Sequence, residues 1–487
     1  MRRDETSQLR FDCTPISQIE LNVECRDEII PLLAGLQHIY GDPKLRARLM
    51  CLVAKDVSKD TRADIGREGF SYWQILVIAV VRLGLNLNYD KLQDLCENHR
   101  NLRFMLGIGD WNNRTNFGWR RLQETLSLLR PETIKEINAV IVSHGQQLHG
   151  SASERVRADS FVMETNIHYP TESSLMWDGI RHVIACSVKL AGMIGASDWR
   201  QAACAQRRIK KQVREVARIS ASKCPKVKAS MKGAYGELIE RVGSLLARAR
   251  TLKAQADEDG RGVLSLALSN ELQSWIDLTA HVTTTAFRRT QLGEEVANQD
   301  KLFSLYETHT QLYQRGKAGE PLQFGRMALI YEDDAGFISH YKLMNRTSND
   351  VDVVVAETRE AQRLHNGKIE TASFDRGFYS EANEKELSTI VKNVCLPPRH
   401  RNAYTARQKD APITYRQARK SHPGIESAIG ALQCGNGLKR CRDRSELGFE
   451  RYLGLAVLGR NLHVLGKLLI SQSDATSNAA KSKRGAA

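Results

Sequence analysis

The chain has 487 residues, too many for one ordinary domain, so roughly two to four domains are expected. Hydrophobic residues make up 41% and charged residues 26%, which allows real cores and excludes an intrinsically disordered chain. The formal net charge of +15 predicts a polyanionic partner, and nucleic acid is favoured over an anionic membrane.

Cysteine usage and the N-terminus indicate an intracellular protein. The ten cysteines lie far apart and none forms a C-x-x-C pair, so neither a disulfide framework nor a paired-cysteine zinc site is predicted. The first residues hold no apolar signal segment, and no run of about 18 uncharged apolar residues occurs. We therefore expect a cytoplasmic protein with no membrane contact.

The first 150 residues are predicted to be helical, in two regions. Residues 1–68 form a polar N-terminal region, and residues 69–150 form a second region. Within the second region, residues 73–81 are apolar almost all round and predict a buried helix, and residues 89–97 carry apolar side chains at helical spacing. A third helix is predicted to begin near residues 113–116, where threonine and asparagine provide a helix-start signal.

The third of these helices is basic, because it carries Arg120 and Arg121. Three short helices with a basic third member can form a helix-turn-helix, in which case these arginines would contact DNA. The alternative is a plain helical bundle, and the pattern alone does not decide between the two.

Residues 200–253 carry most of the positive charge of the chain. This block holds fifteen Lys and Arg against three acids, an excess of twelve. Apolar residues recur in it at helical spacing, which predicts a helical insertion at about residues 176–300. A charge run is usually a solvated face, but so large an imbalance favours phosphate contact. The residues expected to contact DNA are Arg207, Arg208, Lys210, Lys211 and Arg214.

Two aspartates stand out because each closes a short apolar strand. Asp159 ends one such strand, Asp375 ends another, and Glu426 follows 51 residues later on a predicted helix. A carboxylate there is costly to desolvate without a partner, and three brought together would resist ionisation unless a cation lay among them. In a basic chain, this predicts a divalent-metal site for phosphodiester chemistry. Asp333 and Asp334 are rival acids, but they occupy a predicted hairpin turn, where aspartates are ordinary.

The order of predicted elements defines the fold class. Leaving the insertion out, the Asp159 strand is followed by a β-hairpin at 326–343, a helix at 351–364 capped by Asn349, the Asp375 strand and a helix at 381–390. A strand at 391–396, a basic loop at 399–420 and the Glu426 helix come next. This is the layout of an α/β domain of the RNase H-like kind, a mixed sheet with helices on both faces. We expect it to span residues 151–470, followed by a disordered tail at 471–487.

Four stretches of the chain carry a resemblance to a known family. Asp159 with the run E-T-N-I-H-Y-P-T-E-S-S-L at 164–175 is the most specific, and D-R-G-F at 375–378 is moderately so. The others lie at 307–325 and 425–442. Together they resemble the DDE transposases of bacterial insertion sequences, and among these the ISNCY-type group.

The resemblance implies that Asp159, Asp375 and Glu426 are the catalytic acidic triad. It implies two Mg²⁺ or Mn²⁺ ions bound by them, double-stranded DNA as partner, and cleavage and strand transfer at terminal inverted repeats. Because two DNA ends must be brought together, at least a homodimer is expected, in the bacterial cytoplasm at the nucleoid. Arg376 could pair with a phosphate or with Asp375, and phosphate is favoured. His168 could contact the DNA end or simply pack.

One departure from related families limits what can be carried over. Some insertion-sequence transposases carry Tyr, Arg and Lys at fixed spacing around the glutamate, where this chain has Arg419, His422 and Gln433. Donor-strand contacts inferred from that signature therefore do not transfer. Three other functions remain open or disfavoured. A catalytically silent, transposase-derived DNA-binding protein and an RNase H-like nuclease stay possible, whereas a zinc hydrolase is disfavoured for lack of paired His and Cys.

Overall fold

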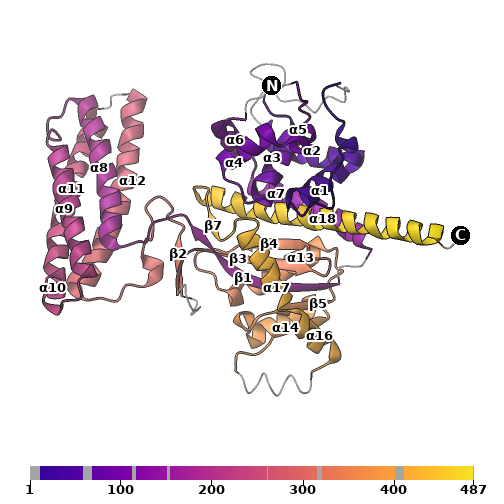
Figure 1. Ribbon diagram of the computed structural model, residues 1–487. Helices are drawn as coiled ribbons and strands as arrows, with labels where there is room; N and C mark the ends of the chain where they lie inside the picture. Colours follow the sequence, from indigo (N-terminus) through magenta and orange to yellow (C-terminus); the bar gives the residue numbers. More distant parts are fainter. Residues whose placement is uncertain are drawn as a thin grey trace. The chain divides into compact units, whose positions relative to one another are not determined.

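The computed structural model describes residues 11–58, 69–111, 117–150, 154–259, 262–314, 321–400 and 411–485, with side chains described to residue 475. The chain divides into two compact units. Unit 1 combines Met1–Glu164 with Arg326–Ala487, and unit 2 is Thr165–Gly325. Figure 1 shows the elements of both units. The predicted insertion at 176–300 falls inside unit 2.

Unit 1 begins with a set of helices that precede its sheet. The helix α3 (Tyr72–Gly84) is buried along its length, as its apolar sequence predicts, and Ser71 and Gln74 form a capping box at its start. The third predicted helix begins at Trp119 in the described residues, and the predicted start at 113–116 lies outside them. The other helices are α1 (Ile29–Gly41), α2 (Pro43–Val57), α4 (Tyr89–Asn98), α5 (Arg100–Met105), α6 (Trp119–Ser127) and α7 (Pro131–His149).

The long helix α18 (Glu446–Gly485) passes between these N-terminal helices and the sheet, where Figure 1 shows it in yellow. Its segment Glu446–Ala475 is long and apolar enough to cross a membrane, but 61% of the apolar window is buried inside the fold, which is typical of a core helix. The helix continues to Gly485, whereas the sequence predicted disorder from Ser471. No proline interrupts it, and Gly485 is the first glycine after Gly466.

A mixed sheet follows these helices, and the predicted α/β class is confirmed. Most of its strands belong to unit 1, whereas β2 and the start of β3 fall within the residue range of unit 2. Its strand order is β2-β3-β1-β5-β6, with β4 paired to β3 and β7 paired to β1. The strands β5 and β6 run parallel to β1 and to each other, and β3 and β4 are antiparallel. The strands are β1 (Arg155–Thr165), β2 (Gln311–Gln314), β3 (Leu322–Asp333), β4 (Ile338–Leu343), β5 (Thr371–Phe374), β6 (Asn393–Cys395) and β7 (Arg440–Cys441).

Helices cover both faces of this sheet. On one face, Val156, Ala158 and Phe374 pack in a core with α13 (Asp350–Leu364) and α14 (Glu381–Ile390). On the other face, Phe161 and Met163 pack in the large core that includes α17 and α18. The alternation along β1 follows from the two-residue period of a strand.

Two parts of unit 1 differ from the sequence prediction. Residues 399–420 were predicted to be a basic loop, but α16 occupies Ile413–Ser421. Its buried residues Tyr415 and Ala418 pack on Cys395 of β6, and this tertiary contact stabilises a helix that lacks a strong apolar stripe. The short strand β7 was not predicted, because two residues are too few to show a period.

Unit 2 is mainly a bundle of long helices. The helix α8 lies beside α9, α11 and α12, and α9 and α12 each pack against both α8 and α11. One core of Leu, Ile, Val and Ala side chains joins all four helices. The helices are α8 (Glu172–Ile194), α9 (Ala202–Ala221), α10 (Pro225–Ala229), α11 (Met231–Asp259) and α12 (Gly262–Phe287).

Candidate active site

The two aspartates lie on neighbouring parallel strands of unit 1. The pairing of β1 with β5 ends with Ala158 opposite Phe374, and the residues that follow are Asp159 and Asp375. Adjacent strands lie about 4.8 Å apart, so the register places the two residues side by side where the pairing of β1 with β5 ends. Asp375 follows the last residue of β5, but Asp159 lies inside β1, which continues to Thr165, so the prediction that Asp159 ends its strand is wrong. Asp375 is 54% exposed, and Asp159 is partly buried and accepts the Ser160 amide proton at 2.7 Å.

Both aspartates belong to the sheet face that α17 covers. Arg157 precedes Asp159 by two residues and Ser373 precedes Asp375 by two, so each pair shares a face. Arg157 donates to the Ser421 carbonyl at 2.9 Å, and the Ser373 hydroxyl lies 3.1 Å from His422 Nδ1. The segment that leads into α17 is therefore fixed on the two strands that carry the aspartates.

The helix α17 (Gly424–Cys434) carries Glu426 in its first turn. Its Ile425 and Ala428 are buried in the same core as Phe161, two residues beyond Asp159. Gly424 at the start of the helix lies close to Arg157, because a Cβ there would overlap the guanidinium and force it to shift. Glu426 itself is exposed, at the start of a helix where the backbone dipole favours a carboxylate. All three acids thus lie on one face of the sheet.

A network of buried charges supports this face. Arg157 Nε donates to Glu332 on β3 at 2.8 Å, and burial raises the pKa of the Glu332 carboxyl above its ordinary value. His422 is only 5% exposed, and burial, together with nearby Arg419, lowers its pKa to about 4. His422 is therefore a neutral hydrogen-bonding group at neutral pH. Arg419 Nη1 lies 3.9 Å from Asp375 and places a cation beside that carboxylate.

The three acids fit Mg²⁺ or Mn²⁺ by donor type, because hard cations prefer carboxylate oxygens. Asp159 and Asp375 also fit by position, as neighbours where the pairing of the parallel strands β1 and β5 ends. Within the described part of the chain, however, no three His, Cys, Asp or Glu side chains converge closely enough to hold a metal ion. An ion shared by all three acids would therefore require their side chains to move closer together.

The rival acids have structural contacts. Asp333 is 1% exposed and accepts hydrogen bonds from Gln146 and from the amides of Ala335 and Phe337, so it closes the β3–β4 hairpin turn. Asp334 pairs with Arg155 at 3.1 Å. Hydrogen bonding to the turn is the ordinary role that the sequence indicated for these aspartates.

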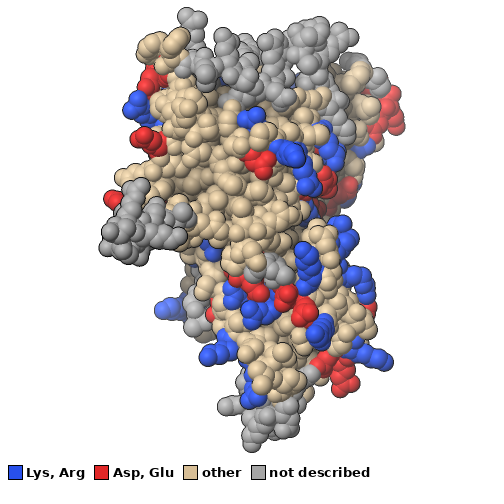
Figure 2. Space-filling model, turned by 90° about the vertical axis from the view of Figure 1, so that its right-hand side faces the viewer, with Lys and Arg blue, Asp and Glu red and all other residues tan. Residues whose placement is uncertain are grey.

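The predicted DNA-contacting residues fall in two settings. In unit 2, the five residues Arg207, Arg208, Lys210, Lys211 and Arg214 are all exposed on α9. In unit 1, the guanidinium of Arg120 lies over Trp119 at 5.1 Å, that of Arg121 lies over Phe70 at 4.3 Å, and Arg376 is partly buried in the turn after Asp375. On the face of unit 1 in Figure 2, basic side chains are interspersed with acidic ones.

Sequence reasoning missed the residues that support the acids. Arg157, Ser373 and His422 were not singled out for their contacts, because each depends on a partner more than 40 residues away along the chain. A usable signal existed in Arg157, a charged residue two positions before Asp159 inside an apolar strand.

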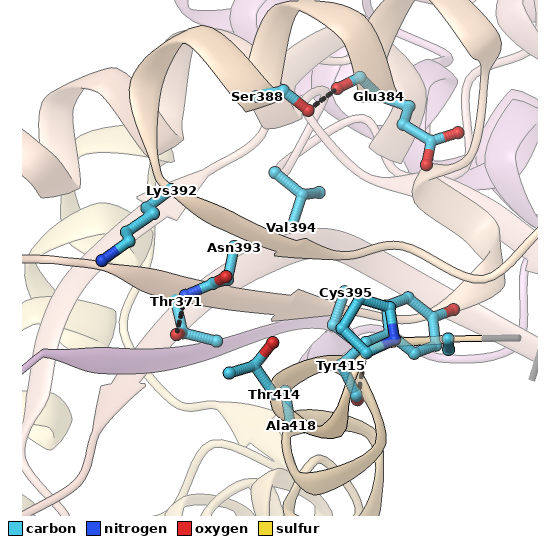
Figure 3. Close-up of a pocket in the computed structure, with 12 residues that line it drawn as sticks. Thr371, Glu384, Ser388, Lys392, Asn393, Val394, Cys395, Thr414, Tyr415 and Ala418 are labelled. Atoms are coloured by element: carbon cyan, nitrogen blue, oxygen red, sulfur yellow. Dashed lines mark hydrogen bonds between the residues drawn. The ribbon is translucent and has the colours of Figure 1, made fainter.

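A pocket of about 380 Å³ lies beside β6, between α14 and α16. Figure 3 shows Asn393 hydrogen-bonded to Thr371 and Ser388 to the backbone of Glu384, with Cys395 and Tyr415 at the side of α16. Thr371 is the first residue of β5, so the pocket lies at the opposite end of that strand from Asp375. The pocket is therefore separate from the acid-bearing site. Protein-family models, curated proteins and solved structures give no match to this chain.

Proposed function

We propose that the protein is a DDE transposase, which binds the terminal inverted repeats of a mobile element and catalyses DNA cleavage and strand transfer with a divalent metal. The observation that carries the proposal is the side-by-side placement of Asp159 and Asp375 where the parallel pairing of β1 with β5 ends, with the Glu426 helix on the same face. The excess of basic residues on the chain supports DNA as the substrate.

The strand arrangement supports an RNase H-like catalytic domain. Starting from β4, the strands follow the order β4-β3-β1-β5-β6. The strand that comes first in the chain, β1, is at the centre. The strands β3 and β4 lie on one side of it, and β5 and β6, which run parallel to β1, lie on the other. This is the order expected of the fold, with unit 2 inserted between its first and second strands.

The acids would hold Mg²⁺ or Mn²⁺, Asp159 and Asp375 from the strands and Glu426 from α17. When bound, such ions activate a nucleophilic oxygen and stabilise the leaving oxygen of an in-line displacement at phosphorus. The protein's own contribution is to fix the carboxylates: neutral His422 and charged Arg157 hold the loop before α17 against both strands. Arg419 Nη1 lies 3.9 Å from Asp375 and would add a cation near a phosphate bound at this carboxylate.

The test is a cleavage assay on duplex DNA that carries the repeats flanking the coding sequence. With Mn²⁺ or Mg²⁺, the wild type should nick these ends and join them to target DNA, and Asp159→Asn should not. Asp334→Asn removes a carboxylate from the nearby hairpin turn and should leave cleavage unchanged. Binding to the ends without cleavage in either metal would instead support a catalytically silent DNA-binding protein, and cleavage of RNA or junctions alone would support a nuclease.

A further inference from the structure

Unit 2 has a surface on which aromatic and basic side chains alternate, here called the α8 strip. On one side, Lys210 of α9 lies 5.7 Å from the ring of Trp177 on α8. One turn further along α8, the guanidinium of Arg181 lies 5.9 Å from the ring of Tyr306. These groups come from different helices and from the segment after α12, so their proximity is not a consequence of sequence spacing.

The strip continues to α12 through three stacked rings. His182 stacks on Trp275 with ring centroids 4.2 Å apart and an interplanar angle of 10°. Tyr306 packs edge-on against both, at 5.6 Å from each, and its hydroxyl contacts His182 Nε2 at 2.8 Å. Tyr306 is 46% exposed, and Trp177, Trp275 and His182 are partly exposed. Large aromatic faces are thus held in fixed orientations at the surface.

Charge is distributed unevenly across the α8 strip. On the α9 side, Arg207, Lys210 and Arg214 are exposed at helical spacing and form one basic stripe. On the α12 side, Glu271 and Asp277 are exposed near Trp275. A bound polyanion would therefore place its charged groups over α9 and its uncharged parts towards the rings on α12.

Arg181 lies between these two sides and is held in place. Its guanidinium reaches the Tyr306 hydroxyl and lies 3.4 Å from the carboxylate of Asp178, which is 7% exposed. Asp178 also lies 3.5 Å from His168, one of the residues whose role the sequence left open. Asp178 lies beneath the surface and orients Arg181, so a ligand on the α8 strip would contact the arginine and not the aspartate.

We propose that the α8 strip of unit 2 binds unpaired nucleotides, with phosphates along α9 and bases on the rings of Trp177, Tyr306 and Trp275. Bases in a duplex are stacked on one another and cannot offer their faces, whereas unpaired bases stack readily on aromatic side chains. A basic groove interleaved with such rings is the general form of a single-strand binding surface. The inference rests on the proposed function for the choice of DNA over RNA.

The test compares binding of the full-length protein to a fluorescent 20-nucleotide thymidine strand and to a 20-base-pair duplex, without metal so that no cleavage is involved. Trp177→Leu and Tyr306→Leu should each weaken single-strand binding by about tenfold or more. Duplex binding should change by less than twofold. Phe287→Leu, an exposed aromatic at the end of α12, should leave both affinities unchanged.

Tyr306→Phe provides a second variant should Tyr306→Leu fail to fold. It keeps the ring but loses the hydroxyl contacts to Arg181 and His182, and it should retain most of the single-strand affinity. Equal losses for single strand and duplex, or no loss in either leucine variant, would overturn the inference. Because binding is read without metal, this failure is distinct from failure of the proposed cleavage activity. Tighter binding to a uridine strand than to thymidine would overturn the choice of DNA.

Discussion

The acid-bearing face of unit 1 and the α8 strip of unit 2 present their charged groups in opposite ways. In unit 1, the two aspartates lie side by side on neighbouring strands and Glu426 lies in the first turn of α17, and buried contacts such as Arg157 to Glu332 and Ser373 to His422 set the positions of these elements. In unit 2, the cations of α9 project from the exposed side of a helix. The first arrangement suits chemistry that requires fixed geometry, and the second suits contact with a flexible phosphate chain.

The difference predicts two kinds of response to mutation. Substitutions on the unit 1 face should have steep effects, because one change disturbs several groups that act together. Substitutions along α9 should have graded and nearly additive effects, because exposed cations act independently through counterion release.

The largest effect is expected for Asp375→Asn. The change removes one negative charge at nearly constant volume, and loss of a metal-binding carboxylate removes several kcal/mol of transition-state stabilisation. We expect cleavage of repeat-ended DNA to fall by on the order of 10³-fold, measured as the single-turnover rate in Mn²⁺. Glu381→Gln, an exposed acid in the first turn of α14, is the matched control and should cleave normally. A loss of less than tenfold in Asp375→Asn would remove Asp375 from the proposed triad.

The aspartate strands illustrate how much of this site could be predicted from the sequence. Asp159 and Asp375 were visible because each follows a short apolar run, and the order of strands and helices predicted that both runs share a sheet. Their side-by-side register could not be predicted, because pairing between residues 216 apart depends on the whole intervening fold. Glu426 gave no strand signal, and its place on the same face follows from packing of Ile425 and Ala428.

Helices were easier to predict from the sequence where the segment itself carries clear capping or apolar spacing. The helix at Glu381–Ile390 appears as predicted, and Asn349 caps the helix that follows it in the manner its sequence indicates. The helix at Ile413–Ser421 was missed, because its stability comes from Tyr415 and Ala418 packing on β6 and not from local preference. The rings of the α8 strip were also not predicted as a cluster, since they meet only when α8, α12 and the segment around Tyr306 pack together.

The second prediction concerns the pH dependence of stability through His422. Burial lowers its pKa from 6.5 to about 4, so between these values the unfolded chain binds a proton that the folded chain does not. Stability must therefore fall as the pH drops from about 6.5 to about 4. His422→Gln removes the histidine whose protonation favours the unfolded chain at low pH. Between pH 7 and pH 4.5 the variant should therefore lose about 2–3 kcal/mol less unfolding free energy than the wild type loses.

Denaturant unfolding at the two pH values measures this difference. His149→Gln, on an exposed histidine at the end of α7, is the control and should keep the wild-type pH dependence. If His422→Gln and the wild type lose equal stability on acidification, His422 is not held neutral beneath the acid-bearing face, and the rigid description of that face is wrong.

The third prediction tests how firmly the segment after Glu426's helix is held. Asn86, in the turn between α3 and α4, donates to the Cys434 carbonyl at 3.0 Å and accepts from Arg442 at 2.7 Å. Its φ of 52° is a left-handed conformation that asparagine tolerates better than alanine. Asn86→Gly should cost about 1 kcal/mol of unfolding free energy through the lost hydrogen bonds, and Asn86→Ala about 2 kcal/mol through added backbone strain.

Thermal or denaturant unfolding of the two variants separates these contributions. The glycine variant is the control for the backbone, because it removes the same side-chain contacts without a Cβ. Equal unfolding free energies of the two variants would show that the turn relaxes to accept the alanine Cβ. This part of unit 1 would then not be rigid, in contrast to the description of the acid-bearing face.

The smallest effect is expected for Arg214→Gln on α9. Removing one exposed phosphate contact should lower the slope of log affinity against log salt by about 0.9 for duplex DNA and about 0.7 for a single strand, with only a several-fold loss of affinity. Arg250→Gln makes the same charge change on α11 and should leave both slopes unaltered if contact is confined to the α9 side. Because an exposed cation acts alone, adding Arg207→Gln should double the change in slope. A collapse of binding in the single variant would instead mean that α9 is an organised site of the kind found in unit 1.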